Sequence, residues 1–126
     1  MGYISDVTMY IRESDDFKKK FNNLENFINL SNMAEESEDE CFTIRKNSKG
    51  ERVLKIYFDY VKWYEDYPIV QFYEKAVEKL DENDYLFVRC GEEVGDFEIT
   101  GFYGNAYPRL TIDYEVNFID DAEEVI

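Results

Sequence analysis

Alternation of apolar and polar residues predicts six β-strands along the chain. The first covers Tyr3–Ile11, where Val7, Met9 and Ile11 recur at every second position. A period of two places such side chains on one face of a strand. The remaining strands are predicted at Phe42–Ile44, Leu54–Tyr60, Tyr85–Cys90, Phe97–Phe102 and Leu110–Phe118.

Two segments repeat their apolar residues at helical spacing instead. In the first, Ser14 is a typical N-cap, and the stripe after it predicts one helix that runs to Leu30. In the second, Pro68 suits the first turn of a helix and Asn83 suits its C-terminus. The stripes consist of Phe17, Phe21, Leu24 and Ile28, and of Ile69, Tyr73, Ala76, Val77 and Leu80.

The predicted order of elements is β-α-β-β-α-β-β-β, and its first six elements have the order of a ferredoxin-like βαββαβ unit. We therefore predict an α+β fold with two helices on one face of a mainly antiparallel sheet, extended by the added C-terminal strands. The other face is then exposed or covered by a partner. Residues 1–119 form a single domain in this interpretation, and the acidic tail 120–126 frays. Loops or turns are predicted at 33–40, 91–96 and 104–108.

The charge of the chain indicates what kind of partner it could bind. The formal net charge is −15, and from residue 90 onward ten acidic residues face a single base, Arg109. A chain this acidic repels nucleic acid and anionic membranes and attracts basic surfaces. The aromatic content of 17% disfavours global disorder, because acidic disordered segments are poor in aromatic residues. The composition therefore favours a binding protein.

Catalytic chemistry finds little support in the sequence. The chain has no histidine, which excludes Ser-His and Cys-His nucleophile pairs, and it has no phosphate-binding glycine loop. Cys41 and Cys90 are not in a metal-binding spacing, and whether they pair with each other stays open. We predict that the protein is not an enzyme and needs no cofactor or metal.

Acidic residues of the C-terminal part are the first candidates for a binding surface. They could hold a divalent cation at the turn around residues 92–98, although the spacing does not match an EF-hand loop. They could also imitate nucleic acid, but alternate residues of a strand lie roughly 6.6 Å apart, whereas duplex DNA carries one charge per roughly 1.7 Å. Several acidic rows would have to lie side by side. The candidate residues are Glu92, Glu93, Asp96, Glu98, Asp113, Glu115, Asp120 and Asp121.

Aromatic residues before the second helix are the other candidates. Trp63, Tyr64 and Tyr67 fall in the connector between the third strand and Pro68, so we expect them to be exposed. Aromatic rings beside carboxylates suit an interface with arginine on the partner.

Three ordered segments resemble a known family. They are the opening MGYISDV, the central segment VKWYEDYP from Val61 to Pro68, and VRCGEEVGDFE from Val88 to Glu98. Together they are similar to a family of small, mostly uncharacterised bacteriophage proteins that begin MGYxSDV and carry KWYxxYP and RxGEEVGDxE segments. The resemblance implies a phage accessory protein but no reaction. By analogy, many small acidic proteins of this kind inhibit host defence or nucleic-acid enzymes.

These observations predict an acidic inhibitor that binds the basic, nucleic-acid-binding site of a host enzyme, in the manner of an anti-CRISPR protein or DNA mimic. It would not contact nucleic acid or a membrane directly. The chain shows no signal peptide and no apolar run of membrane-spanning length, which predicts the cytoplasm, that of the host if a phage encodes the protein. Two alternatives stay open: a sponge for a small signalling nucleotide, held by Arg12, Arg45, Arg89 or Arg109, and a homo-oligomeric assembly protein, with a homodimer as its simplest form.

Overall fold

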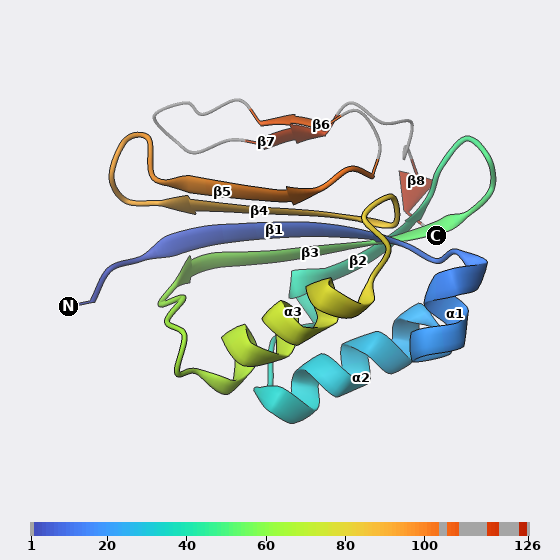
Figure 1. Ribbon diagram of the computed structural model, residues 1–126, viewed down its shortest axis with the longest axis horizontal. Coiled ribbons are helices and arrows are strands. Elements are labelled where there is room, and N and C mark those ends of the chain that lie inside the picture. The colour runs from blue at the N-terminus through green and yellow to red at the C-terminus, as the bar shows by residue number, and fades with distance from the viewer. Residues whose placement is uncertain (1, 104–105, 109–115, 119–123, 126) are drawn as a thin grey trace.

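The computed structural model describes residues 2–103, 106–108, 116–118 and 124–125, and it places side chains for residues 2–103. The strands are β1 Ser5–Arg12, β2 Phe42–Lys46, β3 Arg52–Val61, β4 Tyr85–Gly91, β5 Phe97–Gly101, β6 Ala106–Pro108, β7 Val116–Phe118 and β8 Glu124–Val125. The helices are α1 Asp15–Phe21, α2 Leu24–Ala34 and α3 Pro68–Lys79, with a short 3-10 helix at Asp39–Cys41. The fold is α+β, as the sequence predicts (Figure 1).

The main sheet has the strand order β5-β4-β1-β3-β2-β8, and all of its pairs are antiparallel. Its centre, β4-β1-β3-β2, joins the two predicted βαβ halves with β1 and β3 side by side, which is the ferredoxin-like arrangement. The β4–β5 hairpin adds a strand at one edge, and β8 adds one at the other.

The helices all lie on one face of this sheet (Figure 1). The alternating residues of β1 that face them, Val7, Met9 and Ile11, are at most 1% exposed. From the helix layer, Phe17 and Tyr73 pack onto them in one core. The apolar stripes seen in the sequence are therefore the faces that build this core.

The first predicted helix is in fact two helices. The chain breaks at Asn22, which has a positive φ of 75°, and Asn23 then caps α2 by accepting the Asn26 backbone N–H at 2.7 Å. A positive φ is more common for asparagine than for most other residues with a side chain. Phe21 and Leu24 stay buried on either side of the break, so the spacing of the apolar stripe did not reveal it.

Other helix limits also differ from the prediction. Ser14 caps α1 and Pro68 begins α3 as expected, but α3 ends at Lys79, with Leu80 rather than Asn83 as its C-cap. The predicted loop 33–40 begins inside α2, which extends past Leu30, and it ends inside the short 3-10 helix.

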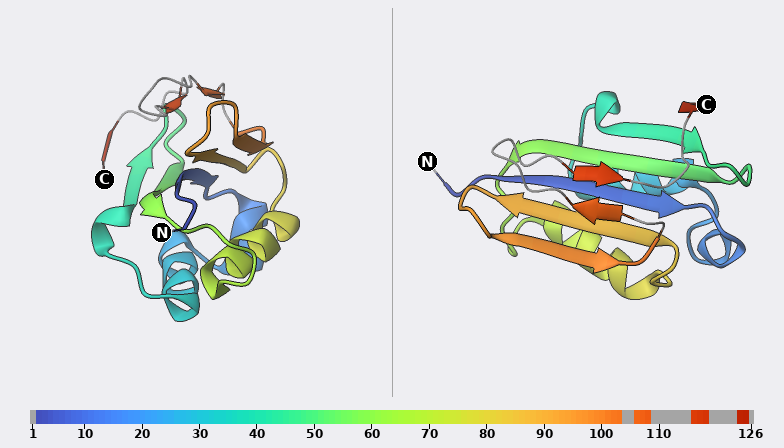
Figure 2. Two further views of the ribbon diagram at one scale, coloured as in Figure 1. Left: turned by 90° about the vertical axis from the view of Figure 1, so that its left-hand side faces the viewer. Right: turned by 90° about the horizontal axis from the view of Figure 1, so that it is seen from above.

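The sheet face opposite the helices carries a second, smaller cluster. Tyr10, Leu86, Val88 and Tyr103 are among its buried residues. The strands β6 and β7 form a separate two-stranded sheet that lies over this face (Figure 2). The chain itself therefore covers part of this face, while Phe97 and Ile99 of β5 stay exposed.

Two predictions for the C-terminal part need correction. Residues 106–108, expected in a turn, form β6, which pairs with β7; only Val116–Phe118 of the predicted sixth strand lies within the described residues. Glu124 and Val125, expected to fray, pair with Lys46 and Arg45 of β2. Their pairing covers the C-terminal end of the β2 edge, which would otherwise expose unpaired backbone groups. No helix within the described ranges has the length and apolar character needed to span a bilayer.

Candidate functional site

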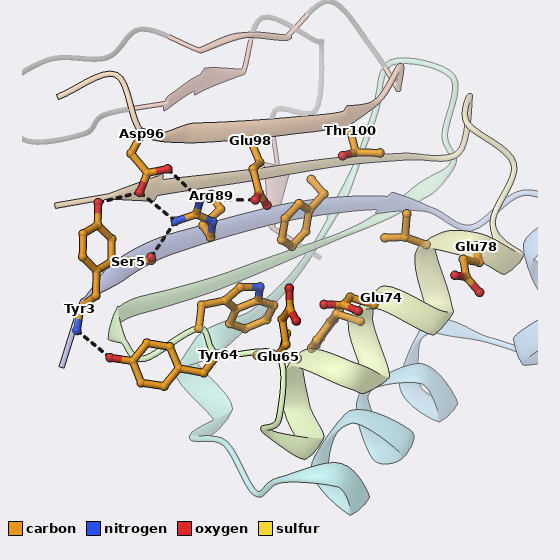
Figure 3. A pocket seen from close by; sticks show the side chains of 15 residues that line it. Tyr3, Ser5, Tyr64, Glu65, Glu74, Glu78, Arg89, Asp96, Glu98 and Thr100 are labelled. Carbon is orange, nitrogen blue, oxygen red and sulfur yellow. Dashed lines mark hydrogen bonds and ion pairs between the residues drawn. The ribbon is translucent and has the colours of Figure 1, made fainter. Parts of the chain in front are cut away.

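A groove runs between α3 and the β4–β5 hairpin, with a volume of about 660 Å³. We call it the α3–β5 groove (Figure 3). It is open because the helices cover the middle of the sheet and leave β5 without a helix above it (Figure 1). Its lining comes from Tyr3, Ser5, Trp63, Tyr64, Glu65, Val70, Tyr73, Glu74, Val77, Glu78, Phe87, Arg89, Asp96, Glu98 and Thr100.

Strand register decides which side chains enter the groove from the sheet. Arg89 of β4 pairs with Glu98 of β5, and Phe87 pairs with Thr100. Directly paired residues of antiparallel strands point to the same face. Since Phe87 belongs to the helix-facing core, all four side chains point towards the helix layer and therefore towards the groove.

Among the described residues that line the groove, Arg89 is the only basic one, and carboxylates already engage it. Its Nη2 lies 2.9 Å from Asp96 Oδ1 and 3.4 Å from Glu98 Oε1, and its Nη1 donates to Ser5 Oγ at 3.1 Å. Asp96 also accepts the Tyr3 hydroxyl at 2.6 Å. Hydrogen bonds from Arg89 and then from Tyr3 lower the pKa of Asp96.

The opposite wall of the groove carries carboxylates whose side chains have no partner among the described residues. Glu65 precedes α3, while Glu74 and Glu78 lie one turn apart on its exposed side. None of the three makes a side-chain hydrogen bond or ion pair to the part of the chain that the structure describes. With Asp96 and Glu98 they put five negative charges against one positive charge, a net −4.

The predicted site residues separate into groups. Asp96, Glu98, Trp63 and Tyr64 come together in the groove, although more than 30 residues separate the acidic pair from the aromatic pair. Tyr67 lies beside the groove, with its ring 5.4 Å from that of Tyr64.

Glu92 and Glu93 belong to the turn beyond the groove and anchor the N-terminal segment. Glu92 Oε1 accepts the Ile4 N–H at 2.7 Å, and the Glu93 N–H donates to the Tyr3 hydroxyl at 3.0 Å. The candidates Asp113, Glu115, Asp120 and Asp121 lie outside the described residues.

The aromatic candidates are less exposed than expected. Trp63 is half-buried, because the connector turns back onto the core and its indole ring lies about 6 Å from the rings of Phe58, Tyr73 and Phe87. Tyr64 is also half-buried, and its hydroxyl accepts the Tyr3 N–H at 2.6 Å. Both rings therefore support the groove more than they project from it.

Sequence reasoning missed Glu65, Glu74 and Glu78. Glu74 and Glu78 have a helical spacing of four, and Glu74 directly follows the buried Tyr73. That pattern marks one side of a helix but is equally typical of a solvated face. Only the position of β5 opposite α3 makes these residues part of a common surface.

Cysteine and metal chemistry gain no geometric support in the described ranges. Cys90 is buried, and desolvation raises the pKa of its thiol, which disfavours the nucleophilic thiolate. Cys41 and Cys90 are both free thiols. Within the same ranges, no three Cys, Asp or Glu side chains gather as metal ligands would. In the turn around residues 92–98, which was considered for a divalent cation, Asp96 forms an ion pair with Arg89.

Comparisons of the chain with protein-family models, with curated proteins and with solved structures find no match. The case for a function therefore depends on the groove itself.

Proposed function

We propose that the protein is an acidic inhibitor that binds the basic, nucleic-acid-binding surface of a host protein through its α3–β5 groove. The observation that carries this proposal is the net charge of −4 in the groove. Its three carboxylates from the connector and α3 have no side-chain partner within the described ranges. The overall charge of −15 supports the same kind of partner.

The groove suits arginine and lysine side chains of such a partner. Glu74 and Glu98 approach it from opposite walls (Figure 3), and Trp63 and Tyr64 also belong to its lining. A guanidinium that enters can contact a carboxylate and an aromatic face together. Arginine and lysine side chains of the partner that are bound in the groove can no longer contact the phosphate groups of nucleic acid.

Charge complementarity of this type acts mainly on the association rate. Each exposed ion pair contributes under about 1 kcal/mol, so no single carboxylate should dominate the affinity. The combined field accelerates encounter and is screened by salt. The proposed complex therefore forms fast and weakens as ionic strength rises.

A matched pair of variants tests the proposal. The groove variant is E65Q/E74Q/E78Q, and the loop variant is E35Q/E36Q/E38Q, which removes the same charge from a segment away from the groove. Immobilised wild type is expected to retain a nucleic-acid-binding protein from bacterial lysate at low ionic strength and to release it at high ionic strength. The groove variant should lose that protein while the loop variant keeps it. Purified, the captured protein should no longer bind its nucleic acid when the wild type is added.

Two outcomes would contradict the proposal. If the loop variant loses the partner while the groove variant keeps it, the binding face is wrong. If the captured protein binds nucleic acid equally well with and without the inhibitor, the inhibitory role is wrong. The proposal further places the protein in the host cytoplasm and assigns it no catalytic activity.

The alternatives have less support. A nucleotide sponge needs several available arginines in one pocket, but Arg89 is paired as described above, and Arg12 Nη2 lies 2.6 Å from Asp84 Oδ1. Arg45 Nε is buried without a hydrogen-bond partner among the described residues, but Arg45 is on β2 and does not line the groove. Arg109 lies outside the described residues. An assembly protein was inferred from an uncovered sheet face, and β6 and β7 lie over part of that face (Figure 2).

A further inference from the structure

The two edges of the main sheet differ. At one edge the last two residues of β2 are paired with β8, whereas β5 at the other edge pairs only with β4 in the part of the chain that the structure describes. Figure 2 shows β5 along the outer border of the sheet. The side chains of residues 97–100 are all exposed. An edge strand in this state presents every second backbone N–H and C=O outward.

Within the described residues, the β5 edge has only one of the usual protections against pairing, the charge of Glu98. Proteins block such edges with proline, with charged residues such as lysine, or with a bulge. The sequence of β5 is Phe-Glu-Ile-Thr-Gly, and its register with β4 runs without a shift from Phe97 to Gly101. Phe97 and Ile99 are 43% and 42% exposed, which is a large exposure for apolar residues in a strand.

The two sides of the β5 edge have different chemistry. Glu98 and Thr100 face the α3–β5 groove, where Glu74 and Glu78 add negative charge. Phe97 and Ile99 face the opposite side, because successive side chains of a strand alternate. A chain laid along this edge would also point its side chains alternately to the acidic side and to the apolar side.

We infer that the β5 edge pairs with an extended segment of the basic partner, in which lysine or arginine alternates with aliphatic or aromatic residues. This inference rests on the proposed function and specifies how the partner binds. Backbone hydrogen bonds to β5 would hold the segment, its cations would point into the groove, and its apolar residues would cover Phe97 and Ile99.

A second copy of the chain is a poorer occupant of the same edge. Two copies each carry a net charge of −15, and pairing of β5 with β5 would bring two Glu98 side chains and two acidic grooves together. Like charges placed close across a strand pair are destabilising. Charge complementarity therefore selects a basic segment.

Synthetic peptides test the inference. The first probe is an acetylated, amidated peptide of four Lys-Val repeats; the second has the same sequence, with alternate backbone nitrogens methylated so that one edge cannot pair. We expect the first peptide to bind wild-type protein about tenfold more tightly than the second at low ionic strength. It should also slow hydrogen exchange at the outward amides of β5, while the methylated peptide should not.

The E65Q/E74Q/E78Q variant separates the two proposals. If both peptides bind wild type equally, and both bind this variant more weakly, the edge pairing is overturned while the acidic groove stands. If neither peptide distinguishes wild type from the variant, the groove fails as a cation site and the edge inference fails with it. If the β5 amides are already protected in a concentration-dependent dimer without peptide, a second copy occupies the edge and the inference is wrong.

Discussion

Substitution of Asp96 by asparagine should show that this residue holds the groove together and is not simply part of its charge. The carboxylate receives the Tyr3 hydroxyl at 2.6 Å and Arg89 Nη2 at 2.9 Å. Asparagine keeps one acceptor, loses the negative charge and directs an N–H group at one of its two donors. The change therefore weakens both contacts and frees the segment that Tyr3 anchors.

The magnitude follows from the exposure of the pair. A hydrogen bond to a charged group contributes about 1.5–3 kcal/mol when buried. The Asp96 side chain is 35% exposed and that of Arg89 is 13% exposed, so solvent screening reduces this contribution. We expect D96N to lower the free energy of unfolding by about 1–2 kcal/mol. The matched control E98Q should cost less than about 0.5 kcal/mol, since Glu98 is 59% exposed and contacts Arg89 only at 3.4 Å.

Urea unfolding followed by tryptophan fluorescence measures the difference. Trp63 is the single tryptophan and packs beside the groove, so its emission reports this region. Faster hydrogen exchange at the Tyr3 and Ile4 amides in D96N would show that the N-terminal segment is released. If D96N and E98Q unfold at the same urea concentration and both leave these amides protected, the role assigned to Asp96 is wrong.

Two further predictions concern stability. Hydrogen bonds from Arg52 lower the pKa of Glu13 and lower that of Glu25 to about 2, so their stabilisation is complete above the unfolded pKa of about 4.5 and is lost as the pH falls towards 2. Wild type and E25Q should differ in unfolding free energy by about 0.5–1 kcal/mol near pH 6, a small difference because Glu25 is exposed. This difference should shrink as the pH falls from about 4.5 towards 2. A difference that does not change with pH would contradict the prediction. The Tyr73 and Ser31 hydroxyls form a buried hydrogen bond of 2.8 Å, so Y73F should cost about 1–2 kcal/mol by urea unfolding and S31A/Y73F should recover part of that loss. No recovery in the double variant would show that the cost of Y73F does not come from an unpaired hydroxyl.

The sequence by itself determined the elements with strong periodicity. The alternation in β1 and the apolar stripe of α3 predicted their faces correctly, because burial of one face is a local pattern with a fixed period. The order of elements also predicted the ferredoxin-like sheet, since few un-knotted, right-handed connections satisfy it. Local pattern did not reveal the break at Asn22, because the helices on both sides bury their residues against the same core.

Tertiary structure alone decided the composition of the candidate site. Glu74 and Glu98 lie 24 positions apart in the sequence, and the local pattern around each is typical of a solvent-exposed acidic side chain. They share a groove because β5 extends the sheet beyond the helix layer and turns Glu98 towards α3. Likewise, the sequence shows Asp96 as one acid in a charged turn, and only folding places it between Tyr3 and Arg89. The net charge is a property of composition. Whether acidic side chains meet in one groove depends on strand register and on which part of the sheet the helices leave open.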